Sequence, residues 1–177
     1  MFPTVSDKTK SAFTHQQEQA RPGYYQVLLD DEGIQAELTA SVRVGVHRYT
    51  YPQGKEARLW LDLDHSANKG SWNRRIIQSQ IRIISPTEVE GYRIITGWAK
   101  LRKIYFHIEF SKPIHFSEFH DGGRKYKNTP VINGTDLHGL FTFDMRQDQE
   151  LVCKVALSPV SIENARLNMS KEVPGWD

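Results

Sequence analysis

The sequence IQAELTASVRVGVHRYTYP, residues 34–52, alternates apolar and polar side chains. From residue 34 to residue 46 every even position is apolar, and most odd positions are polar. A two-residue period places the apolar side chains on one face of a β-strand, whereas a helix would spread them around its circumference. The run is longer than an average strand of about five to six residues. It therefore predicts either two strand segments joined by a bend near residues 40–41 or one long strand that crosses a large sheet.

Shorter runs with the same period occur along most of the chain. They cover residues 24–29, 58–63, 78–84, 91–98, 103–110, 140–144 and 151–157. In the fifth of these runs the pattern places Phe106 and Ile108 inward and His107 outward. Residues 24–29 are predicted to form a hairpin with the next strand, residues 140–144 and 151–157 a second hairpin, and residues 121–136 a long loop. Recurrent short strands separated by turn residues predict a mainly β fold, an antiparallel β-sandwich or barrel.

The last twenty or so residues follow a different pattern, which predicts a short C-terminal helix. Ser158 and Pro159 offer a helix N-cap followed by proline at the first helical position. Ile162, Ala165 and Met169 then lie on one helical stripe, and the Pro-Gly pair at residues 174–175 ends the helix.

Composition excludes several classes of protein. The 177 residues carry 23 basic and 21 acidic side chains, a net charge of +2, which argues against a dedicated nucleic-acid binder. No apolar run approaches the ~20 residues of a membrane span, and residues 1–13 lack the apolar core of a signal peptide. The single cysteine, Cys153, lies in an apolar run and is predicted to be a buried hydrophobic residue.

Four segments together resemble a known family. Residues 36–52 contain AELTA, R-x-G-x-HRY and TYP in that order, as in the N-terminal domain of glycoside hydrolase family 92, the calcium-dependent α-mannosidases of bacteria. Three further segments are similar to the same domain: AFTHQQEQARPGYYQV at residues 12–27, the blocks GWA, IYF and FSKPI within residues 97–114, and LSPVSIENARLNMSKEVPGWD at residues 157–177. The four segments keep the family's order and span almost the whole chain.

The resemblance implies a specific architecture. Family members are inverting exo-mannosidases, mostly acting on α-1,2-linked mannose, in which a large β-sandwich packs on an (α/α)6 catalytic barrel that supplies the calcium ligands and the acid and base. By this resemblance, residues 1–157 are the later part of the β-sandwich, a large supersandwich-like domain that is incomplete here. Residues 158–177 are the linker helix that leads to the catalytic domain. The family's opening segment and its catalytic domain have no counterpart in the sequence.

The resemblance also sets the expected function. We expect a fragment of a glycosidase that is inactive alone, needs no cofactor of its own, packs on the catalytic domain and helps to wall a cleft for mannose-containing glycans. Nucleic acid and membrane are not expected partners, and export is expected of the family. The alternatives are a free-standing carbohydrate-binding β-sandwich and an unrelated protein-interaction or transport domain.

The carboxylates of the chain are the first candidates for catalytic groups. Inverting glycoside hydrolysis requires two carboxyl groups about 6.5–9.5 Å apart. Asp62 and Asp64 share a strand face and could form a metal or acid/base pair, but a polar strand face that ends in a turn is the favoured interpretation. His115 and His120, near Glu118, fit no closed zinc pattern. We therefore predict no catalytic residue and no metal ligand in this chain.

Three residues are candidates for substrate binding. His47 is predicted on the polar face of its strand, whereas Arg48 is in phase with the apolar face. A buried arginine requires a partner carboxylate or a sugar hydroxyl, because an unpaired buried charge is costly. Trp72 lies in the loop-like sequence NKGSWNR and is a candidate for stacking on a sugar ring, whereas Trp98 is in phase with a strand and is predicted in the core.

Overall fold

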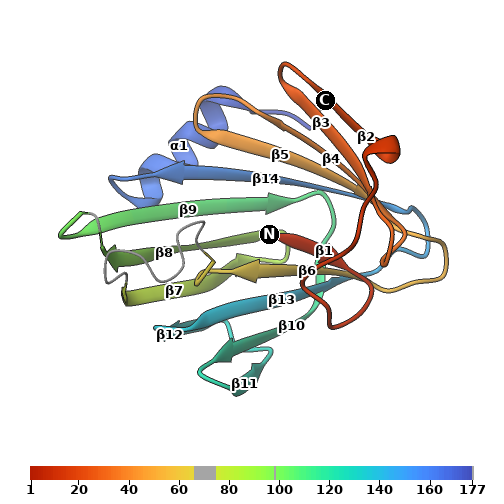
Figure 1. The fold of residues 1–177 in the computed structure, drawn as a ribbon. Helices are drawn as coiled ribbons and strands as arrows, with labels where there is room; N and C mark the ends of the chain where they lie inside the picture. Colours follow the sequence, from red (N-terminus) through yellow and green to blue (C-terminus); the bar gives the residue numbers. More distant parts are fainter. Residues whose placement is uncertain (66–74, 98, 177) are drawn as a thin grey trace.

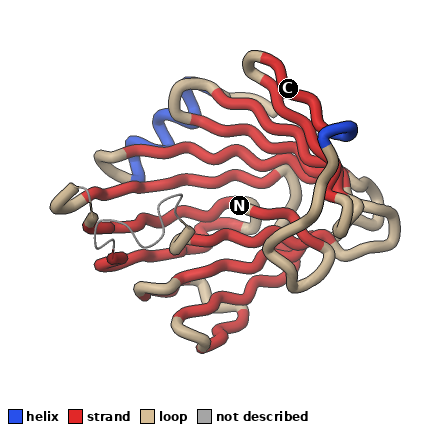
Figure 2. Tube along the Cα trace, in the orientation of Figure 1, coloured by secondary structure: helices blue, strands red, loops and turns tan. Residues whose placement is uncertain are grey.

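The structure, a computed structural model, describes residues 1–65, 75–97 and 99–176. Two antiparallel sheets face each other, and the C-terminal helix lies on the outer side of the larger one (Figure 1). Strands dominate, and a 3-10 turn at His15–Gln17 is the other helical element drawn in Figure 2. The prediction of a mainly β antiparallel sandwich with a short C-terminal helix is confirmed. No helix in the described part of the chain is long and apolar enough to cross a membrane.

The two sheets differ in size. The smaller sheet has the order β1 (Phe2–Thr4), β6 (Ala57–Asp62), β13 (Leu137–Phe143), β10 (Ile114–Asp121) and β11 (Arg124–Lys127). The larger sheet has the order β12 (Val131–Gly134), β7 (Arg75–Ser85), β8 (Glu88–Thr96), β9 (Arg102–Phe110), β14 (Glu150–Ser158), β5 (Val44–Thr50), β4 (Ile34–Ala40), β3 (Tyr24–Leu29) and β2 (Glu18–Arg21).

The alternating run at residues 34–52 forms two strands that turn back on each other. Strands β4 and β5 pair antiparallel, and Ala40 lies opposite Gly45. Directly opposed residues share a sheet face, so the even positions of β4 share a face with the odd positions of β5. The predicted phase of β5 is therefore wrong. His47 points to the inner face that the core residue Tyr49 also occupies, and Arg48 points outward.

Two predicted connections are also wrong. Strands β13 and β14 do not form a hairpin, because β13 pairs with β6 and β10 in the smaller sheet and β14 pairs with β5 and β9 in the larger one. Both strands bury apolar residues on an inner face, so their sequence patterns are alike although their partners differ. Residues 121–136 are not one long loop, since they contain β11 and β12.

The core fills the space between the sheets. Its rings include Phe110, Phe119, Phe141 and Phe143, with centroids of neighbouring rings 5.0 to 5.9 Å apart. Cys153, on the central strand β14, is fully buried among them, and burial raises the pKa of its thiol to about 12. The thiol therefore stays protonated and unreactive in the folded chain.

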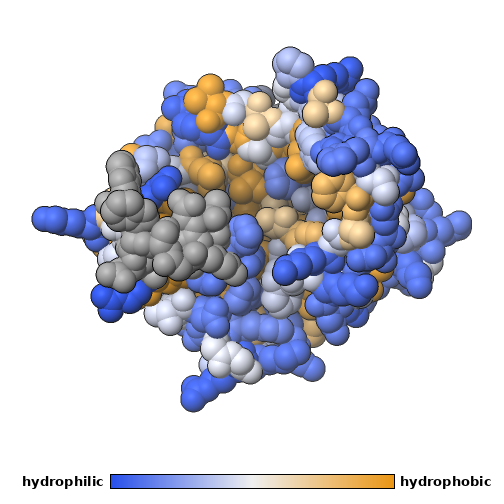
Figure 3. Space-filling model, in the orientation of Figure 1, coloured by the Kyte–Doolittle hydropathy of each residue, from blue (hydrophilic) through white to orange (hydrophobic). Residues whose placement is uncertain are grey.

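The smaller sheet does not cover the larger one completely. Leu157, near the end of β14, is on the inner face opposite the core residue Phe106, yet it is 46% exposed. Figure 3 shows apolar residues gathered in a hollow in the middle of this face, over β14 and its neighbouring strands. Part of the large sheet's inner face is thus open to solvent in this chain.

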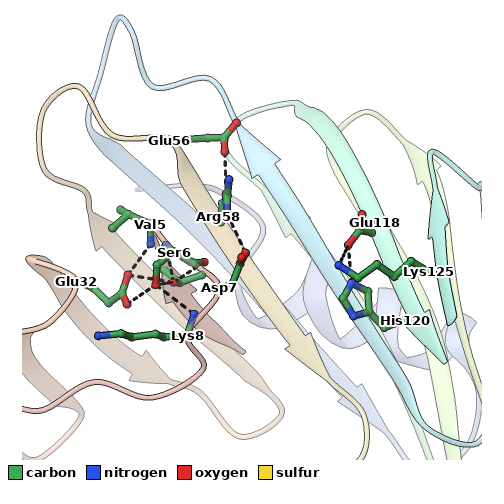
Figure 4. Close-up of polar contacts among 11 residues, drawn as sticks. Val5, Ser6, Asp7, Lys8, Glu32, Glu56, Arg58, Glu118, His120 and Lys125 are labelled. Atoms are coloured by element: carbon green, nitrogen blue, oxygen red, sulfur yellow. Dashed lines mark hydrogen bonds and ion pairs between the residues drawn. The ribbon is translucent and has the colours of Figure 1, made fainter. Parts of the chain in front are cut away.

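A buried carboxylate ties the N-terminal segment to the larger sheet. Glu32, in the turn between β3 and β4, accepts hydrogen bonds from the Val5 amide at 2.7 Å, Ser6 Oγ at 2.9 Å and Thr4 Oγ1 at 3.0 Å (Figure 4). Burial alone would raise the pKa of Glu32, but these donors lower it. The charged carboxylate therefore holds β1 in place at the edge of the smaller sheet.

Helix α1 runs over Ile162–Glu172 and packs on the outer face of the larger sheet. Its N-cap is Ser161, not Ser158, and Pro159 precedes the helix. Ala165 and Met169 pack against Val44 and Ala156, and the helix ends before Pro174 as predicted. At its end the Glu172 carboxylate accepts hydrogen bonds from Ser41 Oγ, the Arg43 amide and Arg43 Nε at 2.6, 2.9 and 2.6 Å.

Removal of the N-cap should destabilise the protein modestly. Ser161 Oγ accepts a hydrogen bond from the Asn164 amide at 3.1 Å, so Ser161→Ala leaves that amide without its cap. We expect a loss of about 1 kcal/mol in the free energy of unfolding, measured by urea titration. The matched control is Ser170→Ala in the same helix, because Ser170 Oγ donates back to the Leu167 carbonyl and contributes no cap. Equal losses in the two variants would contradict the assignment.

Candidate functional site

A groove of about 430 Å³ crosses the outer face of the larger sheet beside the C-terminal segment. Outward side chains of β3, β4, β5 and β14 form its floor, and residues 173–176 form one wall. The side chains that give this outer-face groove its chemical character are those of Tyr24, Glu37, Arg48, Lys154 and Trp176.

Arg48 stands in the groove beside an acidic partner. It lies directly opposite Glu37 on β4, and its Nη1 atom is 3.8 Å from Glu37 Oε2. Tyr24 donates its hydroxyl hydrogen bond to Glu37 Oε1 at 2.7 Å, and this bond raises the pKa of Tyr24. The predicted partner carboxylate of Arg48 therefore exists, but the pair lies on the outer face, where Arg48 is exposed and Glu37 is half-buried.

Lys154 joins the floor of the groove to its wall. The side chain is only 3% exposed, and its ammonium lies 2.6 Å from Glu109 Oε2. It also donates a hydrogen bond to the Val173 carbonyl at 3.3 Å and stands 4.2 Å from the centroid of the Trp176 ring. A cation over an indole face is an attractive contact, stronger when desolvated. Lys154 therefore fixes the C-terminal segment against β14.

An ionic network beside the groove anchors helix α1. Glu90 on β8 is completely buried, and it binds Arg82 of β7 through one carboxylate oxygen and Arg166 of α1 through the other. His107 on β9 lies 4.0 Å from Glu90 and 3.5 Å from Glu109. It was predicted to face outward, which is correct, but the helix covers it, so it is only 3% exposed.

His47 lies on the other side of the sheet from Arg48. Its Nδ1 atom is 2.8 Å from the Tyr49 hydroxyl on the inner face. Burial, with a smaller effect of the N-terminal charge, lowers the pKa of His47 to about 4. The imidazole is therefore neutral at pH 7 and forms part of the inner packing. His47 and Arg48, predicted together, do not share a site.

A second polar cluster occupies the outer face of the smaller sheet. The Trp60 ring stacks on the His138 ring at 5.7 Å and meets the His120 ring edge-on at 5.0 Å. His120 Nε2 and Lys125 Nζ converge on Glu118 Oε1 at 2.7 and 3.1 Å (Figure 4). The Trp60 ring is therefore already in contact with two imidazole rings of the cluster.

Asp62 is held in this cluster as a structural carboxylate. It accepts hydrogen bonds from the Asp64 and His65 amides at 2.7 and 2.8 Å, and His138 Nε2 lies 3.3 Å away. Burial opposes ionisation, but His138 and these amides lower the pKa of Asp62 to about 2. The same contact raises the pKa of His138. An aspartate this acidic is a poor proton donor at neutral pH, which fits a turn-capping role.

The Asp62–His138 pair should make stability depend on pH. The contribution of Asp62 is present above its ordinary pKa of 3.8 and is lost as the pH falls toward 2. The contribution of His138 is present below its ordinary pKa of 6.5 and is lost as the pH rises through its raised value. We expect His138→Gln to cost about 0.5–1 kcal/mol near pH 5.5 and much less near pH 9, measured by urea titration. His115→Gln, at an exposed position of β10, is the control, and a pH-independent loss in His138→Gln would contradict the pairing.

A larger cleft of about 1000 Å³ lies between the loops at residues 52–56 and 144–149. Arg146 is paired with Asp144 there, and Glu56 with Arg58. The one aromatic ring in its lining apart from His115 is Phe143, which is buried. Within the described ranges, no group of three or more His, Cys, Asp or Glu residues could hold a metal ion. The outer-face groove therefore combines accessible aromatic and charged groups better than this cleft does.

The remaining candidate from the sequence, Trp72, lies outside the described residues, as does Trp98. Trp176 and Lys154 were not predicted as site residues. Lys154 interrupts the apolar run LVCKVAL on the outward positions, and a lysine in such a run is a signal for a buried ion pair. No comparable signal marks Trp176, which enters the groove because helix α1 brings the chain back across the sheet.

A nine-stranded sheet facing a five-stranded one, with a helix on its outer side, is a β-sandwich domain with a polar groove on one face. Residues 2–158 match the family model described as the glycosyl hydrolase family 92 N-terminal domain. The chain therefore belongs to this family. No curated protein matches the chain.

Solved structures give the same fold. A family 92 α-mannosidase from Bacteroides thetaiotaomicron, solved in complex with mannoimidazole, is 32% identical with a TM-score of 0.84 over 94% of this chain and 22% of its own. A family 92 inverting mannosidase from the same organism is 24% identical with a TM-score of 0.80 over 99% of this chain and 24% of its own. A bacterial glucoamylase complexed with acarbose shares only the fold, at 7% identity and a TM-score of 0.53. The chain spans 22% to 24% of the length of these two mannosidases.

Proposed function

We propose that this chain is the β-sandwich part of an exo-α-mannosidase and that it acts by packing on a catalytic domain and helping to wall the cleft for mannose-containing glycans. The single observation that carries the proposal is the family match over residues 2–158, together with mannosidase structures that superpose on nearly the whole chain. Preference for α-1,2 linkages, dependence on calcium and export belong to the same proposal and follow from the resemblance alone.

The residues of the chain support an auxiliary role in hydrolysis. The most acidic carboxylate of the small-sheet cluster, Asp62, is committed to two backbone amides and His138. Glu90 is committed to two arginines and is completely buried. Neither carboxyl is free of partners, as a general acid must be to reach a glycosidic oxygen. In this proposal the acid, the base and any calcium ion belong to the catalytic domain.

The test is hydrolysis of α-1,2-mannobiose with calcium present. We expect the chain alone to be inactive and a family 92 catalytic domain to gain activity when the chain is added. The matched control is the β-domain of a glucoamylase, which shares the fold but not the sequence. Activity of the chain alone, or a catalytic domain that neither binds the chain nor gains activity from it, would contradict the proposal.

A second function, a free-standing carbohydrate-binding module, is favoured by one observation. The outer-face groove presents an exposed indole and an ion pair in a space of ligand size on the described chain itself.

A further inference from the structure

We propose that the outer-face groove is a binding site for a hexopyranose sugar, in which Arg48 and Glu37 bind ring hydroxyls and Trp176 packs against the ring. The choice of sugar as the class of ligand rests on the proposed function. The inference goes further because it places a sugar site on this chain itself, in a groove to which the proposed function assigns no role.

The dimensions of the groove fit a small ligand. Its volume of about 430 Å³ lies within the range of ordinary ligand sites, roughly 300–1,000 Å³. The floor is formed by sheet strands, and the wall at residues 173–176 is tied to β14 by Lys154. A site built on a sheet and a fixed wall needs little ordering when a ligand enters, which favours binding.

Arg48 and Glu37 supply the hydrogen-bonding groups that a diol requires. The Arg48 side chain is 53% exposed, and among the described residues its guanidinium makes no side-chain hydrogen bond of ordinary length, since Glu37 is 3.8 Å away. Its planar donors therefore remain available. Glu37 Oε2 lies next to them, while Tyr24 holds the other carboxylate oxygen at 2.7 Å. A sugar hydroxyl both donates and accepts, so two neighbouring hydroxyls can bridge this carboxylate and guanidinium.

Trp176 supplies an oriented apolar surface. It is 46% exposed, and the Lys154 ammonium holds its ring from one side at 4.2 Å. Glu109 fixes that ammonium at 2.6 Å, so the position of the indole depends on a buried ion pair. The C–H face of a pyranose ring is apolar, and an aromatic surface of this kind is where it packs.

The charges of the groove favour a neutral polyol over an anion. Each cation has a carboxylate partner on the sheet, Arg48 with Glu37 and Lys154 with Glu109. An anion would have to displace a carboxylate or lie beside it, whereas sugar hydroxyls interact with both members of a pair. The site is therefore expected to discriminate sugars from phosphate.

The experiment is a titration of the full 177-residue chain with methyl α-D-mannopyranoside, followed by the indole N–H signals in two-dimensional NMR spectra. We expect the Trp176 signal, assigned from Trp176→Phe, to shift with a dissociation constant of about 1–10 mM, as for a ligand of about a dozen heavy atoms. Arg48→Ala and Trp176→Ala should each weaken binding about tenfold or more. Arg124→Ala on the exposed strand β11 and Trp60→Phe on the smaller sheet are the matched controls and should leave binding unchanged.

Three results would overturn the proposal. They are the absence of any shift at tens of millimolar sugar, unchanged binding in both groove variants, and an equal response to inorganic phosphate. These outcomes are separate from those of the hydrolysis experiment, because binding is measured on the chain alone. A groove that binds no sugar would leave the gain of activity with a catalytic domain untouched, and the reverse also holds.

Discussion

Gly91→Ala should destabilise the fold more than the same substitution at any other strand glycine. Gly91 lies in β8 between β7 and β9, and a Cβ atom there would stand 1.9 Å from the Gln80 carbonyl oxygen and 2.7 Å from the Phe106 ring. The carbonyl belongs to the neighbouring strand, so the backbones of β7 and β8 must move apart. We expect a loss of about 3 kcal/mol or more in the free energy of unfolding, measured by urea titration or, if the variant does not fold, by the loss of near-ultraviolet circular dichroism.

The matched control is Gly45→Ala, which adds the same methyl group to another strand of the same sheet. There the nearest atom is His47 Nε2 at 3.4 Å, the end of a side chain that can move. The control should change stability by less than about 1 kcal/mol. Similar losses at both positions would mean that the effect comes from glycine's backbone freedom and not from the close approach of β7.

Glu90→Ala should release helix α1 from the sheet. The buried carboxylate binds Arg82 and Arg166 at once, so its removal leaves two guanidinium groups without their common partner beside His107. Both arginines are close to half exposed and can turn toward water, which places the expected loss near the low end of the range for broken buried pairs, about 3 kcal/mol. Urea titration gives the loss, and amide hydrogen exchange should show faster opening of α1 than of β8.

Arg82→Ala is the control for this prediction. In that variant Arg166 still satisfies Glu90 and still ties the helix to the sheet. We expect a loss of about 1 kcal/mol and unchanged relative protection of α1. Should Arg82→Ala loosen the helix as much as Glu90→Ala does, the anchoring role would belong to the whole cluster and not to the carboxylate.

The two-residue period predicted most strands but not the sheets to which they belong. The alternation in β13 and β14 follows from burial against the same core, so it cannot tell that one strand pairs with β6 and the other with β5. Periodicity also cannot fix the phase across a reverse turn. Because Ala40 pairs with Gly45, Arg48 lies on the outer face and His47 on the inner face, which is the opposite of the prediction.

The candidate site was only partly predictable for a related reason. Outward positions of the larger sheet carry His107, Glu90 and Lys154. The sequence pattern alone indicates that such residues face solvent or interrupt a strand. They are buried because α1 and residues 173–176 lie across them, and no local pattern states where a helix will dock. Arg48 was predicted as a binding candidate and does line the groove, whereas Trp176 is brought there by tertiary structure alone.

The fully buried Cys153 is a natural probe of how often the core of the folded chain opens. Its thiol is the single one in the sequence, and with a pKa of about 12 it reacts with an alkylating reagent only when β14 separates from its neighbours. The rate of labelling under native conditions therefore counts the openings of the central strand, without a denaturant and without an introduced probe. A partner that docks on this domain would be detected as a slower rate, even where it touches no residue of the core.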